Sequence, residues 1–289
     1  MIVAIIVIYE PKYLEFIENL YAILSQVDKV IIVDNSTNSI NYKFNSDKVI
    51  YSFLNGNKGI AEAQNIGISI AEKEKPEFII FFDQDSSIPK GFINNLLDDY
   101  TSIKNSGTNI GLIGPRFIDS RYDFFYKTID YSTGKRKKID VSNIDQPVRS
   151  TLLISSGSLC SLNSIKNVGL MRKEYFIDYV DTEWCFRFES MGYQNYISSK
   201  AIMSHSVGDK IIEFKLFNTP IHSPFRRYFV TRNAFYMFKE KHIPKIVPIR
   251  QFFVNFIQQM IILFGSKNKI SYLKSYLKGF KDGLRYLIK

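Results

Sequence analysis

The chain of 289 residues has very few cysteines, with Cys160 and Cys185 as its two thiols. Two thiols in a chain of this size exclude a disulfide-stapled scaffold and are typical of a reducing compartment. No stretch of about 18 uninterrupted apolar residues occurs, so we expect no membrane-spanning helix. The nearest candidate, residues 246–264, is interrupted by Pro248, Arg250 and amide side chains. The apolar start lacks the basic segment of a signal peptide, so we expect a cytoplasmic protein.

Negative charge is scarce at the C-terminal end. Residues 239–289 hold 11 Lys/Arg against Glu240 and Asp282, a net charge of +9, whereas the whole chain carries +10. The body before residue 239 is therefore nearly neutral. A basic chain suits nucleic acid, an anionic membrane or a phosphorylated ligand. Because nucleic-acid binding needs basic residues on the folded body, we expect no nucleic-acid partner.

Short apolar runs alternate with helical spacing through the first half. Strands are expected at residues 2–8, 29–33, 49–53 and 78–82. Helices are expected at residues 12–25 and 59–72. This alternation predicts an α/β fold with a mostly parallel central sheet and helices on both faces. Ligands of such sheets bind beyond the carboxyl ends of the strands.

The second half is less regular. Residues 120–150 are polar, basic and aromatic and predict an excursion such as a hairpin, while residues 178–191 suit a helix and residues 193–206 a strand. From Pro224 the pattern is helical to the end. Three helix breaks are expected: Pro244, Pro248 and Gly265. We therefore divide the chain into a catalytic domain, residues 1–223, and a basic amphipathic helical region, residues 224–289.

An acidic pair follows the buried strand at residues 78–82. Asp83 and Asp85 are separated by Gln84, and alternate residues of an extended segment point the same way. A hard divalent cation prefers oxygen ligands and shares them with phosphate oxygens. The sequence therefore favours a site for Mn²⁺ or Mg²⁺ and a diphosphate, over a solvated turn.

Other polar clusters also follow strands. Asp34 and Asn35 could accept hydrogen bonds from a nucleobase or ribose, or could simply end a strand. Lys58 and Gly59 open a helix that continues through Asn65. A helix N-terminus attracts anions, and Lys58 would add a point charge. The competing interpretation is a capped core helix.

Residues 178–184 contain three carboxylates and an indole. Asp178 and Asp181 are three residues apart and share a helix face, where a carboxylate can take a proton from a sugar hydroxyl. The competing interpretation is an amphipathic helix in which Glu183 pairs with Arg187.

Two further groups are candidates. His205 beside a glycine turn suits Mn²⁺, or is a packed core histidine. Arg226, Arg227 and Arg232 have helical spacing and suit phosphate oxygens, or form a solvated basic face.

Together these segments resemble the family 2 inverting glycosyltransferases of the GT-A fold, and within them the bacterial rhamnosyltransferases. The likeness covers residues 2 to about 240 and rests on the order and spacing of its motifs. The segments that carry it are residues 2–11, 33–36, 57–67, 82–86, 156–157, 178–187, 205–208 and 226–233.

The resemblance implies roles for these residues. Asp181 would be the catalytic base with Asp178 second, since Glu183 departs from the Asp often found there. Asp83 and Asp85 would bind the metal, with His205 as a further ligand. Donor contacts are implied for Tyr9, Asp34, Asn35, Lys58, Gly59, Asn65, Asp83, Gln84 and Asp85. Acceptor or phosphate contacts are implied for Gly157, Trp184, Arg226, Arg227 and Arg232.

The implied reaction is metal-dependent transfer of a sugar with inversion, with dTDP-L-rhamnose as the favoured donor and UDP-hexoses as the alternative. The implied acceptor is a glycan or lipid-linked glycan in surface polysaccharide synthesis. A nucleotidyltransferase is disfavoured because residues 9–12 lack the glycine-rich basic loop of that class. Apolar helices with lysines on the other face suit the inner membrane surface. The alternatives are a homodimer through the C-terminal helices and a helical cap on the body.

Overall fold

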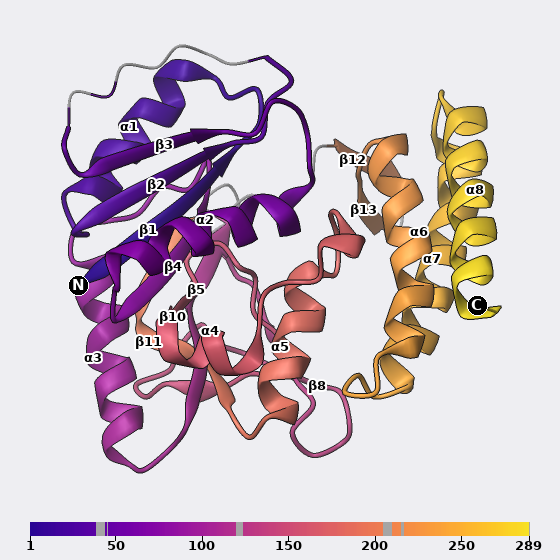
Figure 1. Cartoon of the computed structure of the whole chain (residues 1–289). Coiled ribbons are helices and arrows are strands. Elements are labelled where there is room, and N and C mark those ends of the chain that lie inside the picture. Colours follow the sequence, from indigo (N-terminus) through magenta and orange to yellow (C-terminus); the bar gives the residue numbers. More distant parts are fainter. Residues whose placement is uncertain (39–43, 45, 120–123, 205–209, 215–216, 289) are drawn as a thin grey trace.

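The computed structural model describes residues 1–38, 44, 46–119, 124–204, 210–214 and 217–288. A central sheet has the strand order β3-β2-β1-β4-β10-β5-β11-β9, with β6 paired to β5 (Figure 1). Its strands are β1 (Ile2–Ile8), β2 (Lys29–Asp34), β3 (Val49–Phe53), β4 (Phe78–Asp83), β5 (Ile110–Asp119), β6 (Phe124–Phe125), β9 (Val148–Arg149), β10 (Leu159–Ser161) and β11 (Gln194–Ser204).

Most of the sheet is parallel, as predicted. β1 runs parallel to β2 and β4, β2 to β3, and β5 to β11. The short strand β10 is antiparallel to both β4 and β5, and β9 is antiparallel to β11. The apolar runs of β1, β2 and β4 suit this buried position, since a parallel sheet is covered on both faces.

Helices cover both faces of the sheet. Alternate residues of each strand point to opposite faces and therefore pack in two separate cores. Ile6 packs in one core with α1 (Tyr13–Leu24) and α3 (Phe92–Asn105). Ile5 packs in the other with α2 (Ile60–Glu74) and α5 (Val180–Ser190). Two shorter helices lead to α5: α4 (Leu162–Val168) and the 3₁₀ turn η1 (Lys173–Tyr175).

A close approach sets how tightly α2 packs. A Cβ atom added at Gly67 would lie 2.5 Å from Cγ2 of Ile5 in β1. Only a glycine therefore lets this helix rest on the sheet at its present depth. This contact fixes the middle of α2 relative to the middle of β1.

The expected excursion contains a hairpin. β7 (Thr128–Asp130) and β8 (Lys137–Ile139) pair antiparallel, and Gly134 turns between them with a φ of 76°. Its N–H donates to the carbonyl of Tyr131. A second antiparallel pair, β12 (Lys210–Phe214) and β13 (Phe217–Ile221), precedes the C-terminal helices and has no counterpart in the sequence expectations.

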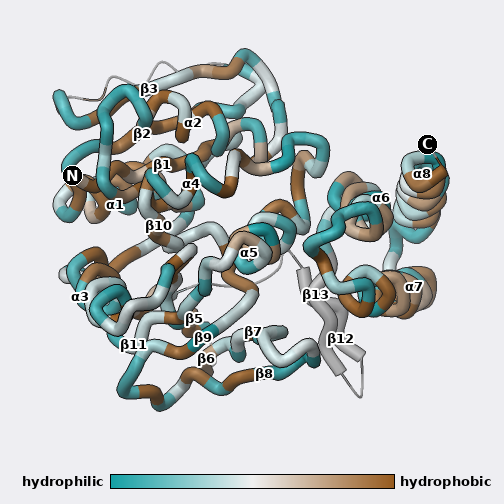
Figure 2. The backbone as a smooth tube through the Cα atoms, turned by 60° about the horizontal axis from the view of Figure 1, so that its bottom comes forward, coloured by the Kyte–Doolittle hydropathy of each residue, from teal (hydrophilic) through white to brown (hydrophobic). Residues whose placement is uncertain are grey.

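Three helices follow: α6 (Pro224–Lys239), α7 (Ile246–Gly265) and α8 (Lys269–Ile288). Breaks at Pro244 and Gly265 are confirmed. The break predicted at Pro248 is wrong, because this proline is the third residue of α7, where its missing N–H has no partner within the helix. In both views α6 lies nearest the body, with α7 and α8 beyond it (Figures 1 and 2).

The C-terminal helices are fastened to the body through α6. The side-chain amide of Asn233 donates to the carbonyls of Tyr175, Ile177 and Asp178 at 2.8, 2.8 and 3.0 Å. By length and composition α7 is also apolar enough to cross a membrane, with a mean hydropathy of 1.4, contrary to the expectation from uninterrupted runs. That measure says nothing of how the helix is placed.

Candidate active site

Two acidic residues end the strands on either side of β1, at the carboxyl end of the sheet. Asp34 ends β2 and Asp83 ends β4, and β1 lies between them, pairing Ile8 with Asp34 and Val7 with Asp83. Because the strands are parallel, both carboxyl ends meet at this edge. The polar clusters predicted from sequence therefore gather where open α/β sheets bind ligands.

The turn after β4 presents the acidic pair. The N–H of Asp83 donates to the hydroxyls of Ser86 and Ser156, at 2.9 and 3.3 Å, and these hydroxyls lie 2.8 Å apart. Asp85 is exposed. Within the described residues no hydrogen bond reaches either carboxylate. The turn is thus held by its backbone, which leaves the acidic oxygens free for a ligand.

Asp181 lies close enough to this acidic pair to interact with Asp83 electrostatically. Burial, and then the charges of Asp85 and Asp181, raise the pKa of Asp83 to about 6, while Arg226 opposes the rise. Burial also raises the pKa of Asp181 to about 6, although it accepts the N–H of Thr182 at 2.7 Å. Mutual repulsion of this kind is relieved by a divalent cation.

Asp178 has a different environment. Its Oδ1 lies 2.6 Å from Nη2 of Arg226, and its Oδ2 lies 3.4 Å from Nε of the same guanidinium. The backbone here is strained, with φ near 65° at Phe176, Asp178 and Tyr179. Such strain persists where the surroundings over-determine the conformation, as Asn233 does here. Asp178 therefore acts as an ion-pair partner in this arrangement.

A cavity of about 290 Å³ opens on another side of Asp181. Tyr126 and Leu153 give it apolar walls, and Arg116 and Lys127 give it cationic ones. It is formed largely by β5 and the predicted excursion. A wider depression of about 490 Å³ lies at the amino-terminal end of β4, the opposite end of that strand from Asp83.

The residues predicted to contact the donor fall into two groups. Tyr9 is 43% exposed and its N–H donates to Oε1 of Gln84 at 2.7 Å, and Lys58 is also exposed. Asp34 is fully buried, and its oxygens accept from the N–H of Ser36 and the hydroxyl of Tyr51. Asp34 therefore holds the strand ends together.

Two predicted donor contacts are buried amides with both groups engaged. Asn35 accepts the N–H of Lys58 at 2.7 Å and donates to Asn57. Asn65 exchanges hydrogen bonds of 2.8 and 2.9 Å with the backbone of Met171. These hydrogen bonds hold both residues in the frame of the site, and the contacts with a donor predicted for them stay predictions.

Two backbone amides at the start of α2 are already engaged. The N–H groups of Ile60 and Ala61 donate to the carbonyl of Phe176, at 2.7 and 3.4 Å. Gly59 has a φ of 85°, and a Cβ there would lie 2.7 Å from that same oxygen. The expected anion site at this helix start is corrected accordingly: the helix is capped by the strained segment before Asp178.

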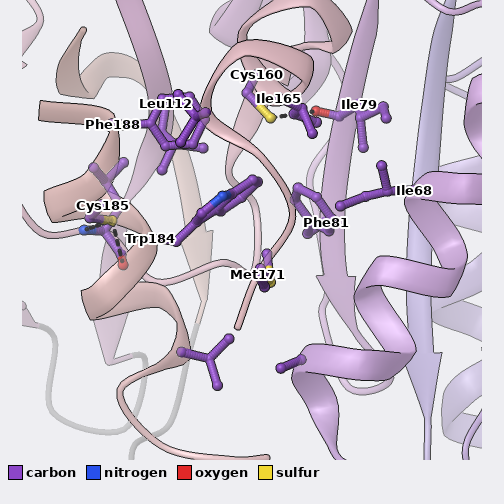
Figure 3. Packing of buried hydrophobic residues seen from close by; sticks show 14 of the residues in the cluster. Ile68, Ile79, Phe81, Leu112, Cys160, Ile165, Met171, Trp184, Cys185 and Phe188 are labelled. Carbon is purple, nitrogen blue, oxygen red and sulfur yellow. Dashed lines mark hydrogen bonds between the residues drawn. The ribbon is translucent and has the colours of Figure 1, made fainter. Parts of the chain in front are cut away.

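Trp184 lies in the core between the sheet and α5 (Figure 3). Its ring meets Phe81 edge to face at 5.8 Å, and its Nε1 donates to the carbonyl of Gly169 at 2.9 Å. The side chain is 1% exposed, so it positions α5 from beneath. Gly157 turns with a φ of 74° below β4, and its N–H donates to the carbonyl of Phe81.

The three arginines have separate surroundings. Arg226 reaches the acidic cluster through Asp178. Arg227 is buried between α6 and α7, and burial lowers its pKa to about 10. Arg232 donates to the carbonyls of Glu174 and Tyr175. Only Arg226 is therefore brought to the site, and the prediction for His205 lies outside the described residues.

A second group has metal-ligand spacing. Atoms of Glu183, Glu240 and His242 lie within 4.8 Å of one another. However, Glu183 already pairs with Arg187 at 2.7 Å, and Glu240 pairs with Arg172 at 2.9 Å. Two cations compensate these carboxylates, so Asp83 and Asp85 fit a divalent ion better.

Sequence reasoning missed the groups that orient the acidic residues. Ser86 follows the acidic pair directly and could have been found as a turn residue. Ser156 and Asn233 lie in segments that carry the family resemblance, but their contacts with the acidic residues come from distant parts of the chain and were not predicted, and no local pattern marks Tyr51.

Residues 3–146 match the family described as "Glycosyl transferase family 2". The chain is 38% identical to dTDP-rhamnosyl transferase RfbF of Shigella flexneri, over 98% of this chain and 95% of the relative. It is 25% identical to the low-salt glycan biosynthesis hexosyltransferase Agl10 of Haloferax volcanii, over 63% of this chain and 60% of the relative.

Solved structures share the fold. GalNAc-T7 with UDP, GalNAc and Mn²⁺ has a TM-score of 0.58 and 14% identity, covering 80% of this chain and 48% of that one. S. aureus TarS 1-349 with UDP-GlcNAc has a TM-score of 0.56 and 17% identity, covering 99% and 81%. The chain therefore belongs to glycosyl transferase family 2, with the GT-A fold and the glycosyltransferase activity that its strand-end motifs predicted.

Proposed function

We propose that this enzyme transfers L-rhamnose from dTDP-L-rhamnose, with inversion, to a hydroxyl of a glycan or lipid-linked glycan in surface polysaccharide synthesis. The donor is supported by the relative of 38% identity, which is named a dTDP-rhamnosyl transferase. The chemistry rests on one observation: Asp181 lines a cavity and is also near enough to Asp83 for its charge to raise the pKa of that group.

Asp83 and Asp85 are the residues that would hold Mn²⁺ or Mg²⁺. The fit is supported by carboxylates that repel one another and have no hydrogen-bond donors among the described residues. When bound, the ion would neutralise charge on the leaving diphosphate. In this proposal the donor side of the site is lined by Tyr9, Gln84 and Lys58. Three buried residues beneath this surface support it: Asp34, Asn35 and Asn65.

Asp181 acts as the general base in this proposal. It takes the proton of the acceptor hydroxyl as that oxygen bonds to the anomeric carbon. The bond from that carbon to the diphosphate breaks on the opposite face, so the configuration inverts. One carboxylate is sufficient because no covalent sugar–enzyme intermediate forms.

The cavity beside Asp181 is the proposed acceptor site. Its apolar walls suit the carbon face of a sugar ring, and Arg116 and Lys127 suit an acceptor that carries phosphate. An acceptor that entered through this cavity would contact Asp181 first and the sugar donor afterwards.

The test is a nucleoside-diphosphate release assay over dTDP-L-rhamnose and several UDP-hexoses, with and without Mn²⁺, using a bacterial lipid extract as acceptor source. We expect release from dTDP-L-rhamnose that depends on both the cation and the extract. If the enzyme prefers a UDP-hexose, the assignment of dTDP-L-rhamnose as the donor is wrong. If it keeps full activity in the presence of a chelator, the proposed metal dependence is wrong.

A further inference from the structure

Helix α7 turns its polar side inward. The buried guanidinium of Arg227 in α6 donates to Oε1 of Gln259 at 3.1 Å, to Oε1 of Gln258 at 2.8 Å and to the carbonyl of Asn255. The amide of Asn255 in turn donates to the carbonyl of Val230 at 3.1 Å. Hydrogen bonds thus hold this face of α7 to α6.

The opposite side of α7 is apolar and exposed. Its residues recur at spacings of three and four and form one stripe along the helix: Ile246, Ile249, Phe253, Phe256, Ile257, Met260 and Phe264. Exposure runs from 38% at Met260 to 81% at Phe264. A helix of a soluble protein normally buries such a stripe, whereas α7 buries Asn255 and Gln259 and leaves the stripe exposed.

Helix α8 is arranged in the same way. Gly279 and Gly283 let it approach α6, since added Cβ atoms would lie 2.5 Å from the carbonyl of Tyr228 and 2.4 Å from the ring of Phe235. Its other side exposes a second apolar row: Ile270, Leu277, Leu284 and Ile288. Both rows point away from α6, and we call them together the α7–α8 face.

Charge identifies what covers this face. Lys274, Lys281 and Arg285 are exposed on α8 near its apolar row, within a region of net charge +9. Two copies of the chain joined here would bring both positive regions together. An anionic lipid surface accepts the apolar rows and attracts the lysines at once.

We infer that the α7–α8 face lies on an anionic membrane surface, with α7 parallel to the plane of the bilayer. A spanning position would require α7 to leave α6 and strip Arg227 of its amide partners. Because α6 is fastened to the body through Asn233, α7 stays at the interface.

This surface reaches the end of α6 that carries Arg226, the residue that pairs with Asp178. Tyr272 of α8 donates to the carbonyl of His222 at 2.9 Å, four residues before Arg226, the partner of Asp178. The junction of α7 and α8 therefore lies at the active-site end of α6. The delivery of a lipid-linked acceptor there rests on the proposed function, whereas membrane binding itself does not.

The test is co-sedimentation of the full chain with vesicles of phosphatidylcholine, alone or mixed with phosphatidylglycerol. We expect binding to the mixed vesicles, release at high salt, and full extraction by alkaline carbonate. Phe253→Glu with Phe256→Glu should weaken binding about tenfold or more, because two exposed rings would no longer insert. The matched control is Leu14→Glu with Tyr21→Glu on α1, which changes exposed apolar residues elsewhere and should bind normally.

Three results would overturn the inference: no binding of the intact chain to the mixed vesicles, retention through the carbonate wash, or a homodimer in solution that the Phe253/Phe256 variant converts to monomer. Diphosphate release from dTDP-L-rhamnose with a detergent-dispersed lipid extract as acceptor should be equal in all these proteins. Failure of membrane binding with intact release would therefore leave the transferase proposal standing.

Discussion

Arg226 holds the carboxylate of Asp178 with two nitrogens of one guanidinium, at 2.6 and 3.4 Å. The sequence alone leaves Asp178 and Asp181 as competing candidates for the catalytic base. This ion pair distinguishes between them. A carboxylate paired with arginine is a poor proton acceptor, because the cation stabilises its ionised form. Asp181 has no such partner among the described residues and keeps a pKa of about 6.

The first prediction concerns the base. Asp181→Asn should lower kcat for sugar transfer by about 10²–10⁴-fold, since an amide cannot take the hydroxyl proton. Asp178→Asn should cost less, because it removes only the partner of Arg226. Diphosphate release under saturating donor measures both, and unchanged donor affinity by titration shows that the Asp181→Asn variant is folded. A larger loss in the Asp178→Asn variant would reverse the assignment.

The pH profile is a second prediction. Transfer requires ionised Asp181, so kcat/KM should fall below about pH 6, the pKa set by burial of this group. The negative charge of Asp178 also raises that pKa. Asp178→Asn should therefore move the acid limb to lower pH, as the rate profile of both proteins can show. An unmoved limb would mean that another group controls it.

A third prediction tests the acidic pair through stability. The folded pKa of Asp83 is raised to about 6, so the folded form binds its proton more tightly than the unfolded chain, and this group lowers stability as pH rises from about 4 to 6. Asp83→Asn should then raise the metal-free stability at pH 7.5 by about 1–2 kcal/mol. Thermal unfolding measures this difference.

The same variant should lose its response to Mn²⁺. In the unchanged protein the cation should raise Tm at pH 7.5 and have less effect at pH 5, where the carboxylates carry protons. Asp98→Asn on α3 is the control, since Asp98 is exposed and pairs with Lys200 at the surface. A Mn²⁺ shift that survives in the Asp83→Asn variant would contradict the metal site.

Sequence patterns located the sheet, most helices and the acidic edge because those features are local. Buried β-branched runs mark strands such as residues 78–82, and the acidic residues follow them directly. The roles of Arg227 and Trp184 could not be read this way. Each looks like a ligand-binding residue in sequence, yet hydrogen bonds to α7 and to Gly169 place both in the interior.

The strained segment before α5 was equally hidden. None of the residues 176–179 is a glycine, so the sequence does not predict a positive φ in this segment. The conformation is imposed from outside, by Asn233 and by the start of α2. Long-range contacts therefore decide which of the predicted carboxylates is free to react.

A fourth prediction concerns the buried ion cluster behind the site. Glu183 is fully buried and accepts Arg187 at 2.9 and 2.7 Å. Burial would raise its pKa, but the contacts with His242 and Arg187 hold it below the usual range. Glu183→Ala would leave that guanidinium unpaired and should destabilise the fold by about 3–5 kcal/mol. Glu183→Gln, which keeps a hydrogen-bond acceptor, should cost less. Denaturant unfolding compares the two, and equal losses would mean that shape rather than charge matters.

The last prediction links a helix start to catalysis. Gly59 begins α2 with φ 85° and ψ 160°, a conformation almost restricted to glycine, and its added Cβ would strike the ring and the carbonyl of Phe176. Gly59→Ala should cost about 3 kcal/mol and lower kcat, because relief of the clash displaces the segment that leads to Asp181. Gly91→Ala is the matched control: it also caps a helix with positive φ, but nothing lies within 4 Å of its Cβ, so it should cost about 1 kcal/mol and leave kcat unchanged. Equal effects of the two changes on kcat would show that the Phe176 contact does not position the base.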